Sequence, residues 1–149
     1  MRLYNIHTVN RRNKTNINNM ENLVKGLNES ARIINDNNRA NGFWDGEKNF
    51  GELLMLVTSE LGEALEAHRK GRFSDLHLFQ KEHEAQKNHL DGFENAFKIH
   101  IKDTFEDEIA DAIIRLLDLS AGLGIDIESH IRLKVKYNTT RPRLHGKAY

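Results

Sequence analysis

The 149-residue sequence contains no cysteine, a single proline and no excess of either charge. The missing cysteine excludes disulfides, thiolate metal sites and cysteine nucleophiles. With Pro142 as the single proline, almost the whole chain is free to be helical. The 22 Lys and Arg residues balance the 22 Asp and Glu residues, whereas a general nucleic-acid-binding protein normally carries a basic excess. No run approaches the ~18 apolar residues of a membrane span. We therefore expect neither a membrane protein nor a stable nucleic-acid complex.

The beginning of the chain differs in composition from the rest. Residues 1–19 are rich in Asn, contain no acid and lack the apolar stretch of a secretory signal. A chain of this length is about one domain. We expect a flexible arm over 1–19, one helical domain over 20–149 and a cytoplasmic location.

Apolar residues recur at helical spacing in four segments. These segments are 19–38, 49–69, 104–123 and 126–137. Thr104 and Asp126 are typical N-capping residues of the third and fourth segments, and Asn41-Gly42 is a typical stop after the first. The second segment carries an apolar stripe that includes Leu54, and Glu60 lies at the edge of this stripe.

Residues 71–103, between the second and third segments, have a less regular pattern. Ser74-Asp75 is a candidate cap for a helix that runs to about Lys87, and Asp91-Gly92 is typical of a turn. The alternation of Phe97, Ile99 and Ile101 is compatible with either an extended stretch or a helix. The predicted fold is all-α, a four-helix framework with an insertion over 71–103 and a basic tail over 138–149.

Two of the predicted helices each carry two acids three residues apart. Glu60 and Glu63 lie in the second helix, and Glu108 and Asp111 lie in the third. Acids at this spacing share a helix face with Cβ atoms about 5–6 Å apart, so their charges repel and a cation relieves the repulsion. One such pair is typical of a solvated face. Two pairs on two long helices are suited to a hard cation, Mg²⁺ or Mn²⁺.

The opposite charge gathers near the C-terminus, where no acid follows Arg132. The bases there are Arg132, Lys134, Lys136, Arg141, Arg143 and Lys147. Mg²⁺ in proteins usually binds few carboxylates plus substrate phosphates, and neighbouring bases bind the other phosphate oxygens. Carboxylates, a divalent cation and basic residues together are suited to chemistry on a polyphosphate. A di-iron site is disfavoured, because no Glu is followed by His three residues later.

The order Glu60-x-x-Glu63 and then Glu108-x-x-Asp111 resembles the MazG-like, all-α nucleoside triphosphate pyrophosphohydrolases. The surrounding segments SELGEALEAHRKGR, EDEIADAIIRLLDLSAGLGIDIE and KVKYNTTRPRLHGK carry the same resemblance, which covers about 41–147 apart from an insertion over 75–100. The resemblance implies that these four acids coordinate Mg²⁺. It also implies cleavage of (deoxy)nucleoside triphosphates between the α- and β-phosphates, to a nucleoside monophosphate and pyrophosphate.

The same resemblance implies roles for further residues. Lys134 and Arg141 would bind phosphate, and Asn138 would contact sugar, phosphate or a ligand carboxylate. Beside Glu60 and Glu63, the catalytic set would include an acid that orients or deprotonates the attacking water, either Glu66 or Asp107. Members of this family associate, often with sites near subunit interfaces. We therefore expect a homodimer or homotetramer that binds a nucleotide and completes the helical bundle.

Trp44, just before the second helix, is a candidate to stack on a nucleobase, because an aromatic face accepts any base. Packing against the protein is the alternative role for this side chain. Asn49 and Asp45 are weaker candidates for polar contacts to the base. Two other functions stay open: hydrolysis of another polyphosphate such as phosphoribosyl-ATP, and a non-catalytic helical module whose acids bind a basic partner.

Overall fold

The computed structural model describes residues 24–142. Within these residues it contains six helices and no strand, so the predicted all-α class is confirmed. None of the described helices is long and apolar enough to cross a membrane. The predicted arm over 1–19 and the last part of the basic tail, 143–149, lie outside the described residues.

Four helices correspond to the four predicted segments. They are α2 (Leu27–Ala40), α3 (Phe50–Arg69), α6 (Phe105–Gly122) and α7 (Ile127–Thr139). The first predicted segment began at residue 19, of which 19–23 lie outside the described residues. Residues 24–26 are not helical, because Gly26 has a φ of +90°, a left-handed conformation that a helix cannot include. The predicted stop after this helix is present, since Gly42 has a φ of +81°.

Side-chain caps define the starts of the other three helices. The Asn49 side chain accepts from the backbone N–H of Gly51 at 2.9 Å and caps α3. Thr104 Oγ1 accepts from the backbone N–H of Asp107 and caps α6, as the sequence predicts. The Asp126 carboxylate caps α7 in the same way. Each cap binds a backbone N–H that has no partner within the helix.

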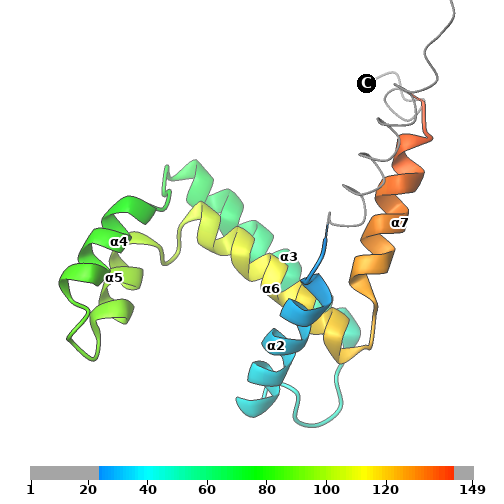
Figure 1. Ribbon diagram of the computed structural model, residues 1–149, viewed down its shortest axis with the longest axis horizontal. Coiled ribbons are helices and arrows are strands. Elements are labelled where there is room, and N and C mark those ends of the chain that lie inside the picture. The colour runs from blue at the N-terminus through cyan, green and yellow to red at the C-terminus, as the bar shows by residue number, and fades with distance from the viewer. Residues whose placement is uncertain (1–23, 143–149) are drawn as a thin grey trace, which may run out of the picture.

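The predicted insertion forms two further helices, α4 (Leu76–Ala85) and α5 (Gly92–His100). Asp75 caps α4 as predicted, and the ambiguous stretch around Phe97 is helical. The two helices pack against each other as a hairpin that projects beyond one end of α3 and α6 (Figure 1). The backbone N–H of Asp75 donates to the carbonyl of His100 at 3.1 Å, so the two ends of the hairpin lie side by side.

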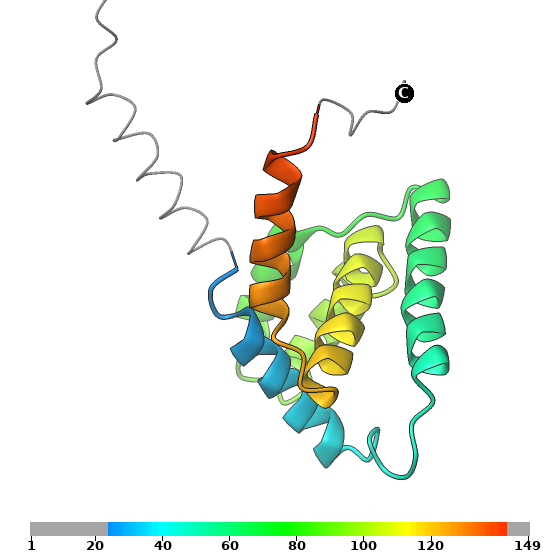
Figure 2. The same cartoon turned by 90° about the vertical axis from the view of Figure 1, so that its right-hand side faces the viewer.

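Helix α6 packs against both α3 and α2: α3 runs beside it, and α2 crosses near its C-terminal end (Figure 1 and Figure 2). Helix α7 packs against α2. The Asn28 side chain joins these two helices, because its Nδ2 donates to Asp126 Oδ1 at 2.7 Å. The backbone N–H of Asn28 also donates to Glu128 Oε1 at 2.9 Å. The start of α7 is thereby attached to the start of α2.

Small side chains fill the buried core of the described residues. The buried apolar residues are Ala31, Val57, Ala64, Ala67, Ala96, Ala112 and Leu117. Alanine at most of these positions lets neighbouring helices approach closely. The larger leucines of the predicted α3 stripe are different, since Leu54, Leu61 and Leu65 are each about half exposed. One side of α3 is therefore apolar and uncovered in the single chain.

Candidate functional site

Three acids meet between α3 and α6. One carboxylate oxygen from each of Glu60, Glu63 and Glu108 lies within 4.8 Å of the other two. Glu60 and Glu108 are buried, while Glu63 is exposed. The sequence pattern predicts Glu60 at the edge of the apolar stripe, and in the structure Glu60 lies within the interface between α3 and α6. The side-by-side packing of these two helices thus joins three of the four predicted metal ligands.

The charge on this group is poorly compensated at Glu108. Burial, the negative charge of Glu63 and a hydrogen bond with Glu60 raise the pKa of Glu108 to about 7. The neighbouring charges of Glu63, Glu60 and Asp107 all raise the pKa of Glu108, so they favour its protonated form. A divalent cation would replace that proton. Three carboxylates with only oxygen donors fit a hard cation, without selecting Mg²⁺ over Mn²⁺.

Asp111, the fourth predicted ligand, lies one helical turn after Glu108 and outside the group of three. Burial raises its pKa first, and the charge of Asp107 adds to this effect. The nearby Arg115 lowers the pKa of Asp111 and offsets part of the increase. Asp111 also lines a pocket beside the three acids. Asp111 therefore lies between the group of three acids and this pocket.

Arg115 is a residue to which the sequence analysis gave no role. Its Nε donates to Glu60 Oε1 at 2.6 Å, from a side chain that is 42% exposed to one that is 7% exposed. A sequence signal for it exists, because Arg115 is the single base among six acids between Asp103 and Asp118. In the structure it places one positive charge at the border between the buried carboxylates and the pocket.

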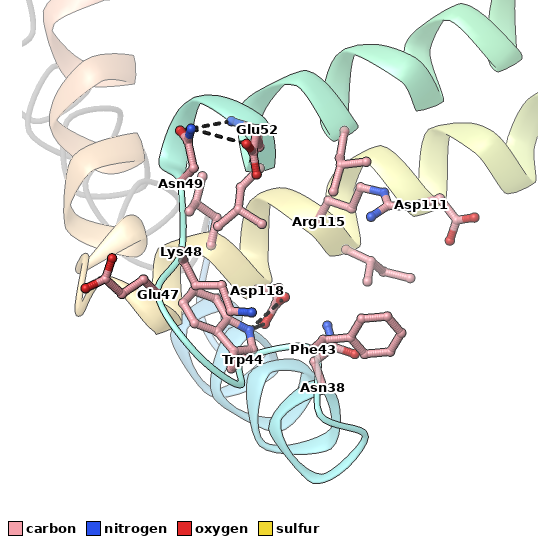
Figure 3. A pocket seen from close by; sticks show the side chains of 14 residues that line it. Asn38, Phe43, Trp44, Glu47, Lys48, Asn49, Glu52, Asp111, Arg115 and Asp118 are labelled. Atoms are coloured by element: carbon pink, nitrogen blue, oxygen red, sulfur yellow. Dashed lines mark hydrogen bonds between the residues drawn. The ribbon is translucent and has the colours of Figure 1, made fainter.

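The pocket has a volume of about 420 Å³ and lies under α3 and α6, next to the loop that joins α2 to α3 (Figure 3). Its lining mixes aromatic, apolar and charged side chains from α2, this loop, α3 and α6. The polar and aromatic part of this lining includes Trp44, Asn49, Glu52, Asp111, Arg115 and Asp118. A pocket of this size accommodates a small organic ligand.

Trp44 is held by several contacts at the wall of this pocket. Its Nε1 donates to both carboxylate oxygens of Asp118, at 2.9 and 3.1 Å (Figure 3). The Arg39 guanidinium lies over the indole, 4.9 Å from the ring centroid. A Cβ added at Gly122 would collide with the six-membered ring. The packing role is therefore present, and stacking of Trp44 on a base stays a prediction.

The two weaker candidates for base contacts differ in position. The Asn49 side-chain oxygen is engaged in capping α3, and its amide donates to Glu52 Oε1 at 3.3 Å (Figure 3). Asn49 lines the pocket, but its polar atoms already have protein partners. Asp45 is exposed and is not among the residues that line the pocket.

The two candidates for the water-activating acid also lie in different surroundings. Glu66 is exposed and forms an ion pair with Lys70 at 3.0 Å, and this partner lowers the pKa of Glu66. Asp107 is half-buried and accepts from the backbone N–H of Asp103 at 3.0 Å. The charge of Asp107 raises the pKa of both Glu108 and Asp111. Asp107 is therefore the candidate that acts electrostatically on the carboxylate site.

The predicted phosphate-binding residues gather around α7: Lys134 and Asn138 lie on the helix, and Arg141 lies two residues after its end. Lys134 Nζ and Arg141 Cζ lie 5.4 and 6.0 Å from the ring centroid of Tyr137. Asn138 Oδ1 is buried and finds no hydrogen-bond partner among the described residues. Helix α7 packs against α2 and lies apart from the hairpin-side half of α3 and α6 (Figure 1). The structure thus groups the bases with each other but does not bring them to the carboxylates within one chain.

Comparison with known proteins adds no relative. The chain matches no protein-family model, no curated protein and no solved structure.

Proposed function

We propose that the protein is a divalent-cation-dependent nucleotide pyrophosphohydrolase of the MazG-like type. It cleaves (deoxy)nucleoside triphosphates between the α- and β-phosphates. The observation that carries this proposal is the group of three acids beside a pocket with an aromatic wall. The carboxylates suit the cation that accompanies a phosphate chain, and the pocket suits the nucleoside at its end.

In this proposal Glu60, Glu63 and Glu108 hold Mg²⁺, and Asp111 joins them. When bound, the cation lowers the pKa of water and neutralises charge that develops on the phosphates. Asp107 accepts the proton as the water oxygen bonds to phosphorus and the bond to the bridging oxygen breaks. The influence of Asp107 on the pKa of Glu108 supports this choice over the ion-paired Glu66.

The bases on α7 complete the site from a second copy of the chain. Two observations support this arrangement: the separation of α7 from the carboxylates and the half-exposed leucines on α3. An uncovered row of Leu54, Leu61 and Leu65 is suited to an interface between copies. Lys134 and Arg141 of one copy then bind phosphate oxygens at the carboxylates of the other.

A substrate panel tests the proposed reaction. Ribo- and deoxyribonucleoside triphosphates and phosphoribosyl-ATP are incubated with Mg²⁺ or with a chelator, and pyrophosphate release is measured. We expect release with Mg²⁺ only, and none from Glu60→Gln or Asp111→Asn variants that keep the wild-type melting temperature. Absence of activity on every substrate, or full activity of these variants, would contradict the proposal. Binding of a basic protein that both substitutions weaken would then favour a non-catalytic helical module.

A complementation experiment tests the contribution of the second copy. Glu60→Gln and Arg141→Ala are each expected to reduce activity in separate preparations. Co-expression of the two variants restores activity if one copy supplies the acids and the other supplies the base. If each chain completes its own site, the mixed preparation is as inactive as its components.

A further inference from the structure

Arg115 lies where the carboxylate site meets the pocket. Its Nε donates to Glu60 at 2.6 Å, and its side chain also lines the pocket, as do Asp111 and Trp44 (Figure 3). Pairing with a buried acid does not by itself require that Arg115 also line the pocket. The exposure of 42% of the side chain leaves part of the guanidinium accessible to a ligand.

The guanidinium has more donors than the protein uses. Arginine presents five N–H donors in a planar fork and stays charged at all accessible pH values. Only Nε is engaged, and the two Nη groups of Arg115 have no hydrogen-bond acceptor among the described residues. These groups are therefore available to an anion or a carbonyl in the pocket.

We propose that Arg115 joins the two parts of the site. Through Nε it is a positioning residue that holds Glu60 for the cation, and through its Nη groups it binds the phosphoryl group next to the nucleoside. This inference rests on the proposed function. Arg115 then contacts the substrate at the point where its phosphate chain leaves the carboxylates and its nucleoside enters the pocket.

The first half of the proposal follows from the carboxylate geometry. Glu60 accepts from Arg115 through Oε1 and also shares a hydrogen bond with Glu108, whose proton a cation would replace. Carboxylates that bind metals are themselves held by hydrogen bonds, and loss of such a partner typically weakens metal binding about 10–100-fold. Because the Glu60 side chain is 7% exposed, solvent cannot replace Arg115 efficiently.

The second half follows from the position of Arg115 between two different environments. A nucleotide with its terminal phosphates at the carboxylates and its base in the pocket crosses the border near its innermost phosphate. The planar fork of arginine matches two phosphate oxygens, which makes it better suited than lysine to this contact. A phosphoryl group is therefore the ligand chemistry that this side chain fits.

Two substitutions, Arg115→Gln and Arg115→Lys, test both halves. The first measurement is the affinity for Mn²⁺ alone, from the shift of melting temperature with no nucleotide present. We expect about 10–100-fold weaker Mn²⁺ binding in Arg115→Gln and partial recovery in Arg115→Lys. Arg32→Gln on α2 is the matched control, since among the described residues Arg32 pairs with two surface acids of its own helix. It should bind Mn²⁺ as the wild type does.

The second measurement uses nucleoside monophosphates and the corresponding nucleosides as competitive inhibitors. The wild type should prefer the monophosphate to the nucleoside. In Arg115→Gln this preference should fall about tenfold because a charge-assisted contact is removed, and in Arg115→Lys it should fall because the ammonium lacks the planar two-donor fork. The KM for the triphosphate should rise in both variants more than kcat falls. Rescue by lysine of Mn²⁺ binding but not of the phosphate preference would separate the two roles.

Three results would overturn the inference. They are unchanged or tighter Mn²⁺ binding in Arg115→Gln, an unchanged preference for monophosphate over nucleoside, and an unchanged KM. If Arg115→Gln does not fold, Arg115→Lys carries the same tests. Failure of the proposed function is distinct, because it appears as a lack of pyrophosphate release in the wild type, whereas the Mn²⁺ affinities test Arg115 without any reaction.

Discussion

The acids between α3 and α6 and the bases on α7 have opposite charge and are built in different ways. Glu60 and Glu108 are buried where two helices pack closely over alanines. Lys134, on α7, and Arg141, just after its end, lie around the exposed ring of Tyr137. A single chain can thus assemble the carboxylate site inside a helix interface. The bases proposed to bind phosphate lie apart from this interface, so in our proposal they form a closed site only with a second copy of the chain.

The largest expected effect comes from removing an acid of the buried site. Glu108→Gln keeps the side-chain shape but removes the charge that must bind a cation. We expect loss of the Mg²⁺-induced rise in melting temperature and a fall in activity beyond the ~10–100-fold typical of residues one step removed from a metal. Without Mg²⁺ the variant should be at least as stable as the wild type, because repulsion with Glu60 and Glu63 is reduced.

Glu106→Gln is the matched control for this experiment. Glu106 lies on the same helix, is exposed and accepts from the backbone N–H of Ser74 at 2.8 Å. It should keep both the Mg²⁺ effect and the activity. Equal behaviour of the two variants would mean that the buried group is not the cation site.

A second substitution affects the pocket without touching any acid. Gly122→Ala places a methyl group against Trp44, and overpacking of this kind typically costs about 1–3 kcal/mol. We expect a lower melting temperature and a higher KM for the nucleotide. Gly62→Ala is the control, since no atom lies within 4 Å of a Cβ there, and a helix-interior glycine replaced by alanine gains about 0.5–1 kcal/mol. Equal stability of the two variants would show that Trp44 moves freely.

The bases on α7 should affect binding without affecting the cation. Lys134→Ala and Arg141→Ala each remove one charge-assisted contact, so we expect KM to rise about tenfold. The Mg²⁺-induced shift of melting temperature should stay at its wild-type value, because the two bases are proposed to bind phosphate oxygens and not the cation. A loss of that shift would mean that these bases contribute to cation binding, as the carboxylates do.

The last expected effect is a pH dependence of stability in the presence of a chelator. Glu108 titrates at about 7 in the folded chain, against an ordinary value of 4.5. Between these values the folded chain holds a proton that the unfolded chain has lost. Stability therefore falls as pH rises from about 4.5 to 7 and is constant above 7. Urea unfolding of wild type and Glu108→Gln isolates this contribution, and parallel pH profiles would contradict it.

Local features of the fold were predictable because they depend on neighbours in the sequence. The caps at Thr104 and Asp126 and the stop at Gly42 act within a turn or two of backbone. The start of α2 was predicted too early, because the left-handed conformation of Gly26 interrupts a pattern that periodicity alone would continue. The ambiguous alternation around Phe97 became a helix by packing against α4.

The sequence by itself determined the helical class, the positions of the caps and the pairing of acids on one face of each helix. These follow from a spacing of three residues, which is a property of a single helix. The tertiary structure decided that Glu60 is buried, that Arg115 binds it and that Leu54, Leu61 and Leu65 stay half exposed. Only the packing of α6 between α3 and α2 selects which side of each helix is covered, and that choice depends on residues far apart in the chain.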